Sequence, residues 1–298
     1  MQVTNVMSSG RSAGISTRTV VELGTTVLET ISAGNYNSSG SVNITGWDLT
    51  QPWPGDFSTW SISTYTAADI PATLIEDDGT QTSGYVTGTS TNVRQLDESQ
   101  EKRTMSLRRD TSNSTTGWTV CAIDLGRVEA ADDEGLCKEA LGEQCTEDLV
   151  VAGMRTYNSE KSCHGSFVMP SSCEDLAGHN ILSSKWLKLT RHSLEALNLG
   201  QNVSDFTIYT GIEDGDRSIH QLGNYTAYDR AANYAHVTML IWAGTNKTVT
   251  SSQMVGLACP RSTTAVRDSQ IPNTSMSEHV SFRLFLGFML LSSLSMVL

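Results

Sequence analysis

Six cysteines are the residues of this chain whose type and number most directly predict chemistry. An even number suits three disulfides formed in an oxidising compartment. A structural zinc site would instead need cysteines separated by about two to four residues, and the gap between Cys163 and Cys173 is longer. We therefore expect disulfides, with neither a metal site nor a cofactor. The six residues are Cys121, Cys137, Cys145, Cys163, Cys173 and Cys259.

The spacing of the cysteines restricts how they pair. Apolar residues recur every four positions from Cys137 to Leu149, which predicts one helical face within residues 135–154. A continuous helix separates Cys137 from Cys145 by about 12 Å, whereas the Cα atoms of a disulfide lie about 4.4–6.8 Å apart. Unless Gly142 breaks the helix, these two cysteines must bond to other segments. An antiparallel return of the chain favours Cys137–Cys173, Cys145–Cys163 and Cys121–Cys259, one of about 15 pairings that six cysteines allow.

Carboxylates and histidines are the next candidates for chemistry. Glycoside hydrolysis uses two carboxyl groups about 5–10 Å apart, and acids cluster after Cys121 at Asp124, Glu129 and residues 132–134. We expect the last four acids to lie at a helix start, where exposed amides favour negative charge. The histidines, which we expect to be surface or core residues rather than catalytic bases, include His192, His220 and His236.

Three further patterns resemble functional motifs without their required context. Trp47, Trp53 and Trp60 could line a platform on which a sugar stacks, but packing in the core or in turns is the favoured interpretation. Residues 10–14 match G-x-S-x-G, yet no strand of an α/β sheet precedes them. Residues 213–216 form an acidic turn that does not fit the calcium-loop spacing. We therefore predict no catalytic residue.

Composition and sequons indicate an exposed, glycosylated surface. The net charge of −12 and the pI near 4.9 argue against nucleic-acid binding, which needs a basic patch. The chain contains seven Asn-x-Ser/Thr sequons, and glycans on them would have to lie on the surface. The sequons begin at Asn37, Asn43, Asn113, Asn202, Asn224, Asn246 and Asn273.

The uncharged run at residues 284–298 predicts a glycosylphosphatidylinositol (GPI) anchor signal. Such a signal needs small residues at the attachment site, a polar spacer of about 8–12 residues and a hydrophobic tail of about 10–20. Asn273 or Ser275 is the expected attachment residue. A tail anchor and a buried core helix are the alternatives. Because residues 1–24 contain no apolar leader, we expect the natural chain to start further upstream.

The predicted fold is α+β, with an N-terminal β-rich part (an antiparallel sheet or sandwich) followed by a disulfide-stabilised helical part. Period-two alternation predicts strands at 41–45 and 60–65, and residues 117–125 form another candidate strand. Helices are expected at 184–199 and 225–242, although 237–242 would equally suit a buried strand. The expected regions are a Ser/Thr/Gly-rich segment (1–35), a β-rich region (36–120) with a charged loop (94–113), a Cys-rich mainly helical region (121–261), a stalk (262–283) and the hydrophobic signal (284–298).

Six spaced cysteines, many sequons, a Ser/Thr-rich stalk and a terminal anchor signal together resemble fungal GPI-anchored cell-surface glycoproteins. That resemblance implies a non-enzymatic glycoprotein with a structural or recognition role at the outer leaflet of the plasma membrane or the cell wall. Its expected partners are the membrane, through the lipid anchor, and wall glycans or another surface protein. The alternatives are an anchored wall-glycan hydrolase or transglycosidase using a carboxylate pair, and a carbohydrate-binding module.

Overall fold

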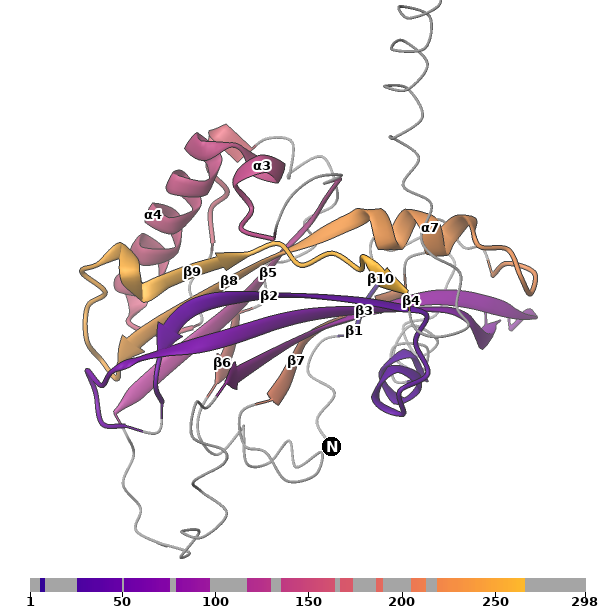
Figure 1. The fold of residues 1–298 in the computed structure, drawn as a ribbon, viewed down its shortest axis with the longest axis horizontal. Coiled ribbons are helices and arrows are strands. Elements are labelled where there is room, and N and C mark those ends of the chain that lie inside the picture. Colours follow the sequence, from indigo (N-terminus) through magenta and orange to yellow (C-terminus); the bar gives the residue numbers. More distant parts are fainter. Residues whose placement is uncertain are drawn as a thin grey trace, which may run out of the picture.

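Long strands with alternating buried and exposed residues build two β-sheets that stack face to face (Figure 1). This arrangement is seen in a computed structural model, which describes residues 6–8, 26–49, 51–75, 79–96, 117–129, 135–163, 167–173, 186–189, 205–212 and 219–265. A helical layer covers the outer face of the smaller sheet, so that this sheet lies between two other layers.

The larger sheet has six strands drawn from both halves of the chain. Its strands are β1 (Val6–Ser8), β2 (Ser38–Trp47), β3 (Phe57–Ile75), β4 (Gln81–Leu96), β7 (Asp205–Ile212) and β10 (Thr264–Ala265). They lie in the order β1-β7-β4-β3-β2-β10, and β1 pairs with β7 in parallel while the other neighbours are antiparallel. The alternation at 41–45 and 60–65 therefore predicts β2 and β3 correctly.

The smaller sheet is buried on both faces. It contains β5 (Trp118–Glu129), β6 (Trp186–Leu189), β8 (Tyr234–Gly244) and β9 (Val255–Ala258), in the order β6-β5-β8-β9. On β8, Leu240 and Trp242 pack against the larger sheet, whereas Met239 and Ile241 pack under the helical layer. Two buried faces explain why β8 is apolar along most of its length.

The helical layer consists of α3 (Lys138–Leu141) and α4 (Glu143–Glu160), with the short 3₁₀ helix η1 (Ser171–Cys173) beside them. On α4, Leu149 and Tyr157 are fully buried against the smaller sheet. Gly153 allows close approach, because a Cβ at this position would lie 2.5 Å from the Met239 sulfur. The cluster under α4 includes all six cysteines, so this layer is both apolar and covalently linked.

The pairing that the cysteine spacing favours is wrong. Gly142, with φ 78° and ψ 158°, ends α3 and separates it from α4, so the helix expected over 135–154 is not continuous. Cys137 has a left-handed backbone before α3 and bonds to Cys259, which follows β9. The described disulfides are Cys121–Cys163, Cys137–Cys259 and Cys145–Cys173, and no cysteine of the chain is free.

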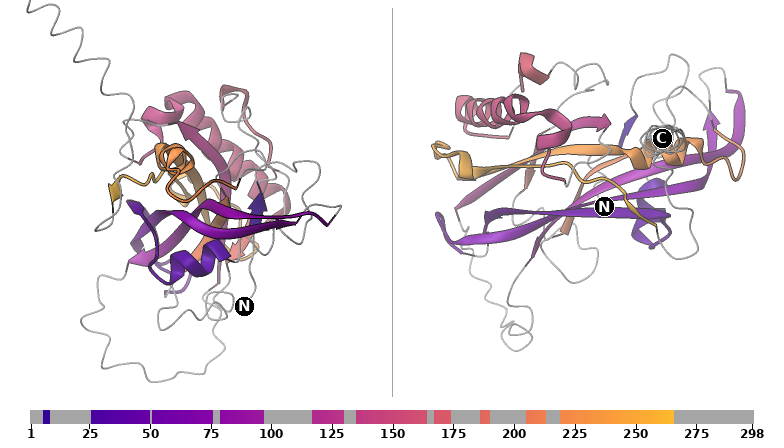
Figure 2. Two further views of the ribbon diagram at one scale, coloured as in Figure 1. Left: turned by 90° about the vertical axis from the view of Figure 1, so that its right-hand side faces the viewer. Right: turned by 45° about the horizontal axis from the view of Figure 1, so that its top comes forward.

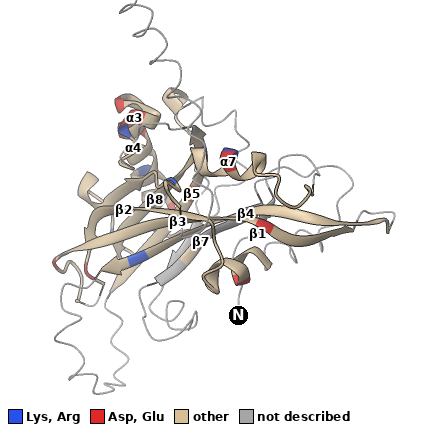
Figure 3. Ribbon diagram, turned by 45° about the vertical axis from the view of Figure 1, so that its right-hand side comes forward, with Lys and Arg blue, Asp and Glu red and all other residues tan. Residues whose placement is uncertain are grey.

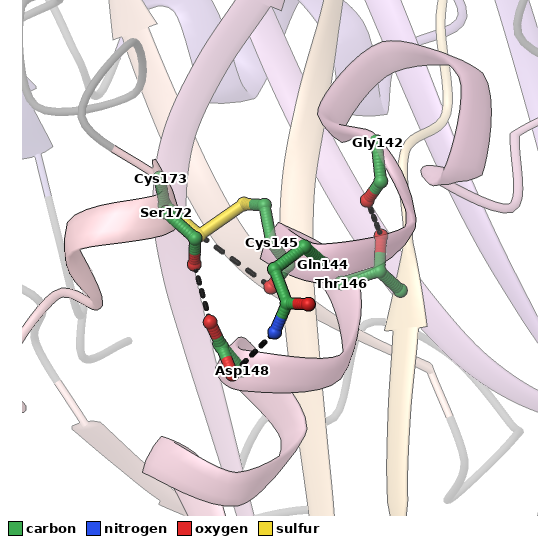
Figure 4. Close-up of a disulfide and its surroundings, with 7 residues drawn as sticks. All are labelled: Gly142, Gln144, Cys145, Thr146, Asp148, Ser172 and Cys173. Atoms are coloured by element: carbon green, nitrogen blue, oxygen red, sulfur yellow. Dashed lines mark hydrogen bonds between the residues drawn. A yellow bond between two sulfur atoms is a disulfide. The ribbon is translucent and has the colours of Figure 1, made fainter.

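The Cys145–Cys173 disulfide holds η1 against the first turn of α4 (Figure 4). Next to it, the Ser172 hydroxyl donates to Asp148 at 2.6 Å, and Gln144 donates to the same carboxylate at 3.1 Å. These hydrogen bonds lower the pKa of Asp148. The carboxylate therefore adds polar contacts to the covalent link between η1 and α4.

The end of β3 and the start of β4 pair with each other, and this part of the larger sheet has a helix on each face (Figures 1 and 2). Residues 26–32 form a helix whose Val27 and Ile31 pack with Ile70 and Val86. The helix approaches closely because β4 has a glycine below it: a Cβ on Gly88 would lie 2.5 Å from Val27. On the opposite face, α7 (Thr226–Asn233) packs over β3 and β4.

The prediction of a β-rich part followed by a helical part is only partly correct. Antiparallel sheets, helices and three disulfides are all present, but β5, β6, β8 and β9 also belong to the region expected to be mainly helical. The helix expected over 225–242 ends at Asn233, and β8 follows it directly. Within the helix expected over 184–199, the structure shows strand β6 instead, and the rest of that range lies outside the described residues. Within the described part, none of the helices has the length and apolar character needed to cross a membrane.

Loop length predicts a different contribution to stability from each disulfide. Cys137–Cys259 closes a separation of 122 residues and Cys145–Cys173 one of 28. The chain-entropy relation gives about 5 kcal/mol for the first and about 3.6 kcal/mol for the second. We expect the double variant Cys137→Ala/Cys259→Ala to lose about 1 kcal/mol more unfolding free energy than Cys145→Ala/Cys173→Ala. Urea unfolding without reductant measures this; equal losses would contradict the loop-entropy explanation.

Candidate functional site

One end of the sandwich gathers four aromatic rings, which we call the aromatic end: Trp47, Trp53, Phe57 and Trp118. The ring centroids of Trp47 lie 4.5 Å from Phe57 and 5.8 Å from Trp118. Trp53 meets Trp118 edge to face at 4.6 Å. The rings come from the end of β2, the loop that follows it, and the starts of β3 and β5.

The loop between β2 and β3 is organised by one carboxylate. Asp48 accepts a hydrogen bond from the Gln95 amide at 2.9 Å and another from the Gln51 amide at 3.2 Å. The Gln51 carbonyl then accepts from the indole N–H of Trp118 at 2.8 Å, and Trp47 donates to the Gln253 carbonyl at 3.3 Å. These hydrogen bonds fix the orientation of the Trp47 and Trp118 indoles.

The aromatic end is a surface feature rather than part of the core. The Phe57 side chain is 55% exposed, and Trp47, Trp53 and Trp118 are half-buried. Trp60, by contrast, is 1% exposed, donates to the Trp47 carbonyl at 3.1 Å and packs on Trp242. The packing expected for Trp60 is therefore confirmed, and Trp118 and Phe57 complete the surface group.

A second group of polar side chains lies between the two sheets, in what we call the polar layer: Thr64, Thr89, Thr91, Asp124, His236 and Thr238. Thr64 is the register partner of Thr91, and Asp124 is the register partner of Thr238. Each pair continues the inward-facing row that begins at Trp60 on β3 and at Trp242 on β8. Nearby, the hydroxyl of Thr66 on β3 lies 2.9 Å from the hydroxyl of Ser262, which belongs to the segment between β9 and β10.

Burial changes the acid–base properties of two groups in this layer. Burial raises the pKa of Asp124 from 3.8 to about 6, although a hydrogen bond from Gly126 N–H and the charge of Arg127 act the other way. Burial, with a smaller contribution from Arg127, lowers the pKa of His236 from 6.5 to about 3. Arg127 lies opposite His236 in the sheet and stacks over the Tyr234 ring. His236 is therefore neutral at physiological pH.

Buried hydroxyls in the polar layer are not fully satisfied. Within the described part of the chain, the hydroxyls of Thr64, Thr89, Thr91 and Thr238 form no hydrogen bond although all four residues are buried. A buried polar group without a partner costs about 1–3 kcal/mol. The charged neighbour that affects Asp124 is Arg127, rather than a second carboxylate such as a glycosidase would need.

Several candidates from the sequence fall elsewhere. Asp124 and Glu129 lie in strand β5, so the helix start expected for Glu129 is wrong. His220 is 3.7 Å from the Asp69 carboxylate and 3.4 Å from the Thr87 hydroxyl. Among the residues that the structure places, no group of His, Cys, Asp or Glu could hold a metal ion. Residues 10–14, 132–134, His192 and 213–216 lie outside the described ranges.

The described sequons differ in how available their asparagines are. Asn43, on β2, and Asn246, in the turn after β8, are exposed. Asn37 is half-buried, and its side-chain oxygen accepts from Ala68 N–H at 2.6 Å. Asn224 is exposed but accepts from Thr226 N–H at 3.2 Å. The sequons at Asn113, Asn202 and Asn273, and the anchor candidate Ser275, lie outside the described residues.

These features define a disulfide-bonded β-sandwich protein with a helical cover on one sheet and an aromatic surface at one end. No protein-family model, curated protein or solved structure matches the chain. What the protein does is therefore inferred from its geometry and its sequence.

The two titrating groups predict opposite pH dependences of stability. The raised pKa of Asp124 adds stability as pH falls from about 6 toward 3.8, whereas the lowered pKa of His236 removes stability as pH falls below 6.5. Between pH 7 and 4.5 the first effect amounts to a gain of about 2 kcal/mol and the second to a loss of about 3 kcal/mol. We expect Asp124→Asn to lose more stability on acidification than the wild type, and His236→Gln to gain stability.

Urea unfolding of the three proteins at pH 7 and pH 4.5 measures this difference. Asp56→Asn, a change at an exposed residue, serves as a matched control for the loss of one carboxylate. Parallel curves for Asp124→Asn and the wild type would show that Asp124 titrates normally.

Proposed function

We propose that the protein is an extracellular glycoprotein with a structural or recognition role and no catalytic activity, held by a GPI anchor at the outer leaflet of the plasma membrane or at the cell wall. The pairing of all six cysteines supports this proposal most strongly. Three disulfides in one chain are characteristic of oxidising compartments and rare in the cytosol.

The exposed positions of Asn43 and Asn246 agree with the proposal, because a glycan needs room outside the fold. The apolar run at residues 284–298 supplies the expected anchor signal. The described chain ends at Ala265, which pairs with Ser38 at the start of β2, while Trp47 ends the same strand. An anchor attached beyond Ala265 would thus leave the aromatic end at the other end of β2.

Phospholipase release tests the anchor. We expect a phosphatidylinositol-specific phospholipase to release the full chain, expressed with a secretory leader, from intact cells. The matched control replaces Asn273, Thr274 and Ser275 with bulky residues that cannot accept the lipid, and this variant should not reach the surface in a releasable form. Surface protein that the enzyme fails to release, with residues 284–298 still attached, would contradict the anchor.

Carbohydrate recognition by the aromatic end is a second candidate function. Aromatic surfaces of this kind mark interaction sites, and the faces of their rings suit the apolar C–H faces of sugars. Charged residues are few along the strands: β2, β8 and β9 contain no Lys, Arg, Asp or Glu (Figure 3). The outward face of β2, which leads to the aromatic end, therefore presents no charge to a neutral partner such as a wall glycan.

Glycan binding by unglycosylated protein tests this candidate. Protein from an oxidising bacterial host should bind neutral wall glycans, and Trp53→Ala and Phe57→Ala should each weaken binding about tenfold or more, as loss of a central aromatic contact does. Trp53→Phe, which keeps a ring face, should retain most of the affinity. Binding that survives both alanine changes in folded protein would exclude the aromatic end as the site.

A further inference from the structure

The sequon at Asn246 lies in a tight turn that is fixed to the sheet. Lys247 N–H donates to the Gly244 carbonyl at 2.8 Å, and Thr245 N–H donates to the Gly117 carbonyl, which precedes β5, at 2.7 Å. Asn246 lies between these contacts with φ 59°, a left-handed conformation that Asn tolerates better than most residues. The asparagine is thus exposed on a backbone that has little freedom to move.

The other side of the sequon is held by α4. Val249 N–H donates to the Asn158 side-chain oxygen at 2.7 Å, and the Asn158 amide donates back to the Val249 carbonyl at 2.8 Å. Val249 is itself buried. Because both ends of the segment are fixed, a glycan on Asn246 would leave the protein from a defined point.

That point is immediately beside the aromatic end. A Cβ on Gly244 would lie 2.8–2.9 Å from the indole carbons of Trp53, so the ring rests directly on the backbone two residues before Asn246. A Cβ on Gly117 would lie 3.7 Å from the Trp53 Cβ. Gly244 and Gly117 therefore contact both the turn that holds the sequon and the Trp53 side chain.

A covalently attached sugar has a strong advantage in occupying this surface. The C–H face of a pyranose ring is apolar, and half-buried indoles are an apolar surface that can cover it. Tethering gives the attached glycan an effective concentration in roughly the millimolar range at a neighbouring surface. Weak stacking is therefore enough to place the tethered glycan on the rings.

We propose that the N-glycan attached to Asn246 folds back onto the aromatic end and covers it, so that the protein's own glycan competes with external sugars there. The inference rests on the proposed function, since it requires passage through the glycosylating secretory route. Asn224 provides the internal comparison: it is exposed just before α7, and β8, which follows α7, extends about 33 Å from Tyr234 to Gly244 at the aromatic end.

Endoglycosidase cleavage of the native glycoprotein tests the proposal. The full chain is secreted from a glycosylating host, and glycopeptide mass spectrometry first establishes occupancy at each sequon. We expect the glycan on Asn246 to be cleaved at least about tenfold more slowly than the glycan on Asn224 in folded protein, and equally fast after denaturation. Trp53→Ala should abolish the difference, and Trp53→Phe should preserve most of it.

A second measurement avoids any change to the rings. Thr248→Ala removes the sequon but leaves Asn246, and it should increase acrylamide quenching of tryptophan fluorescence and unmask binding of external glycans. Thr226→Ala, which removes the Asn224 sequon in the same way, should change neither. This pair keeps the proposal testable if Trp53→Ala does not fold.

The outcomes separate this inference from the proposed function. Glycans at Asn224 but none at Asn246 would overturn the inference alone, as would equal cleavage rates at the two sites or unchanged quenching in Thr248→Ala. Absence of glycans at every sequon, or six free thiols in the secreted chain, would overturn the proposed function itself.

Discussion

The arrangement depends on keeping the smaller sheet buried on both faces. Its β8 strand alternates Leu240 and Trp242 toward the larger sheet with Met239 and Ile241 toward α4. If α4 moved away, that second apolar row would be exposed to water at a cost of about 25 cal/mol per Å². Two disulfides oppose this separation: Cys121–Cys163 joins β5 to the end of α4, and Cys137–Cys259 joins the segments next to α3 and β9.

The three disulfides lie outside the interface between the two sheets. Between the two sheets, the apolar core around Trp60 and Trp242 gives way to the polar layer, whose buried hydroxyls and Asp124 weaken the contact. All six cysteines belong instead to the cluster between the smaller sheet and α4. The polar groups buried between the two sheets reduce stability, and the apolar, covalently linked packing between the smaller sheet and α4 offsets that loss.

Local sequence patterns predict the elements that depend on neighbouring residues, but they do not predict contacts between segments that are distant in the chain. Alternation predicts β2 and β3 because each has one outward polar face, whereas β8 lacks such a face and its run of apolar residues fits a helix or a buried strand equally well. Disulfide pairing depended on the backbone at Cys137 and Gly142, and one glycine among good helix formers does not reveal that break. The six cysteines were predicted to form disulfides; their partners required the fold.

The aromatic end shows the same limit for a functional site. Trp47 and Trp53 are visible as an aromatic-rich segment, but Trp118 joins them only because Gly117 pairs with the turn after β8. The β2 strand places this group about 30 Å from Ser38, its residue next to Ala265, at about 3.3 Å per residue. Ala265, the last described residue before the proposed attachment site, thus lies at the opposite end of β2 from the rings. The same end holds the Asn246 turn, so external sugars and the protein's own glycan would meet at one surface.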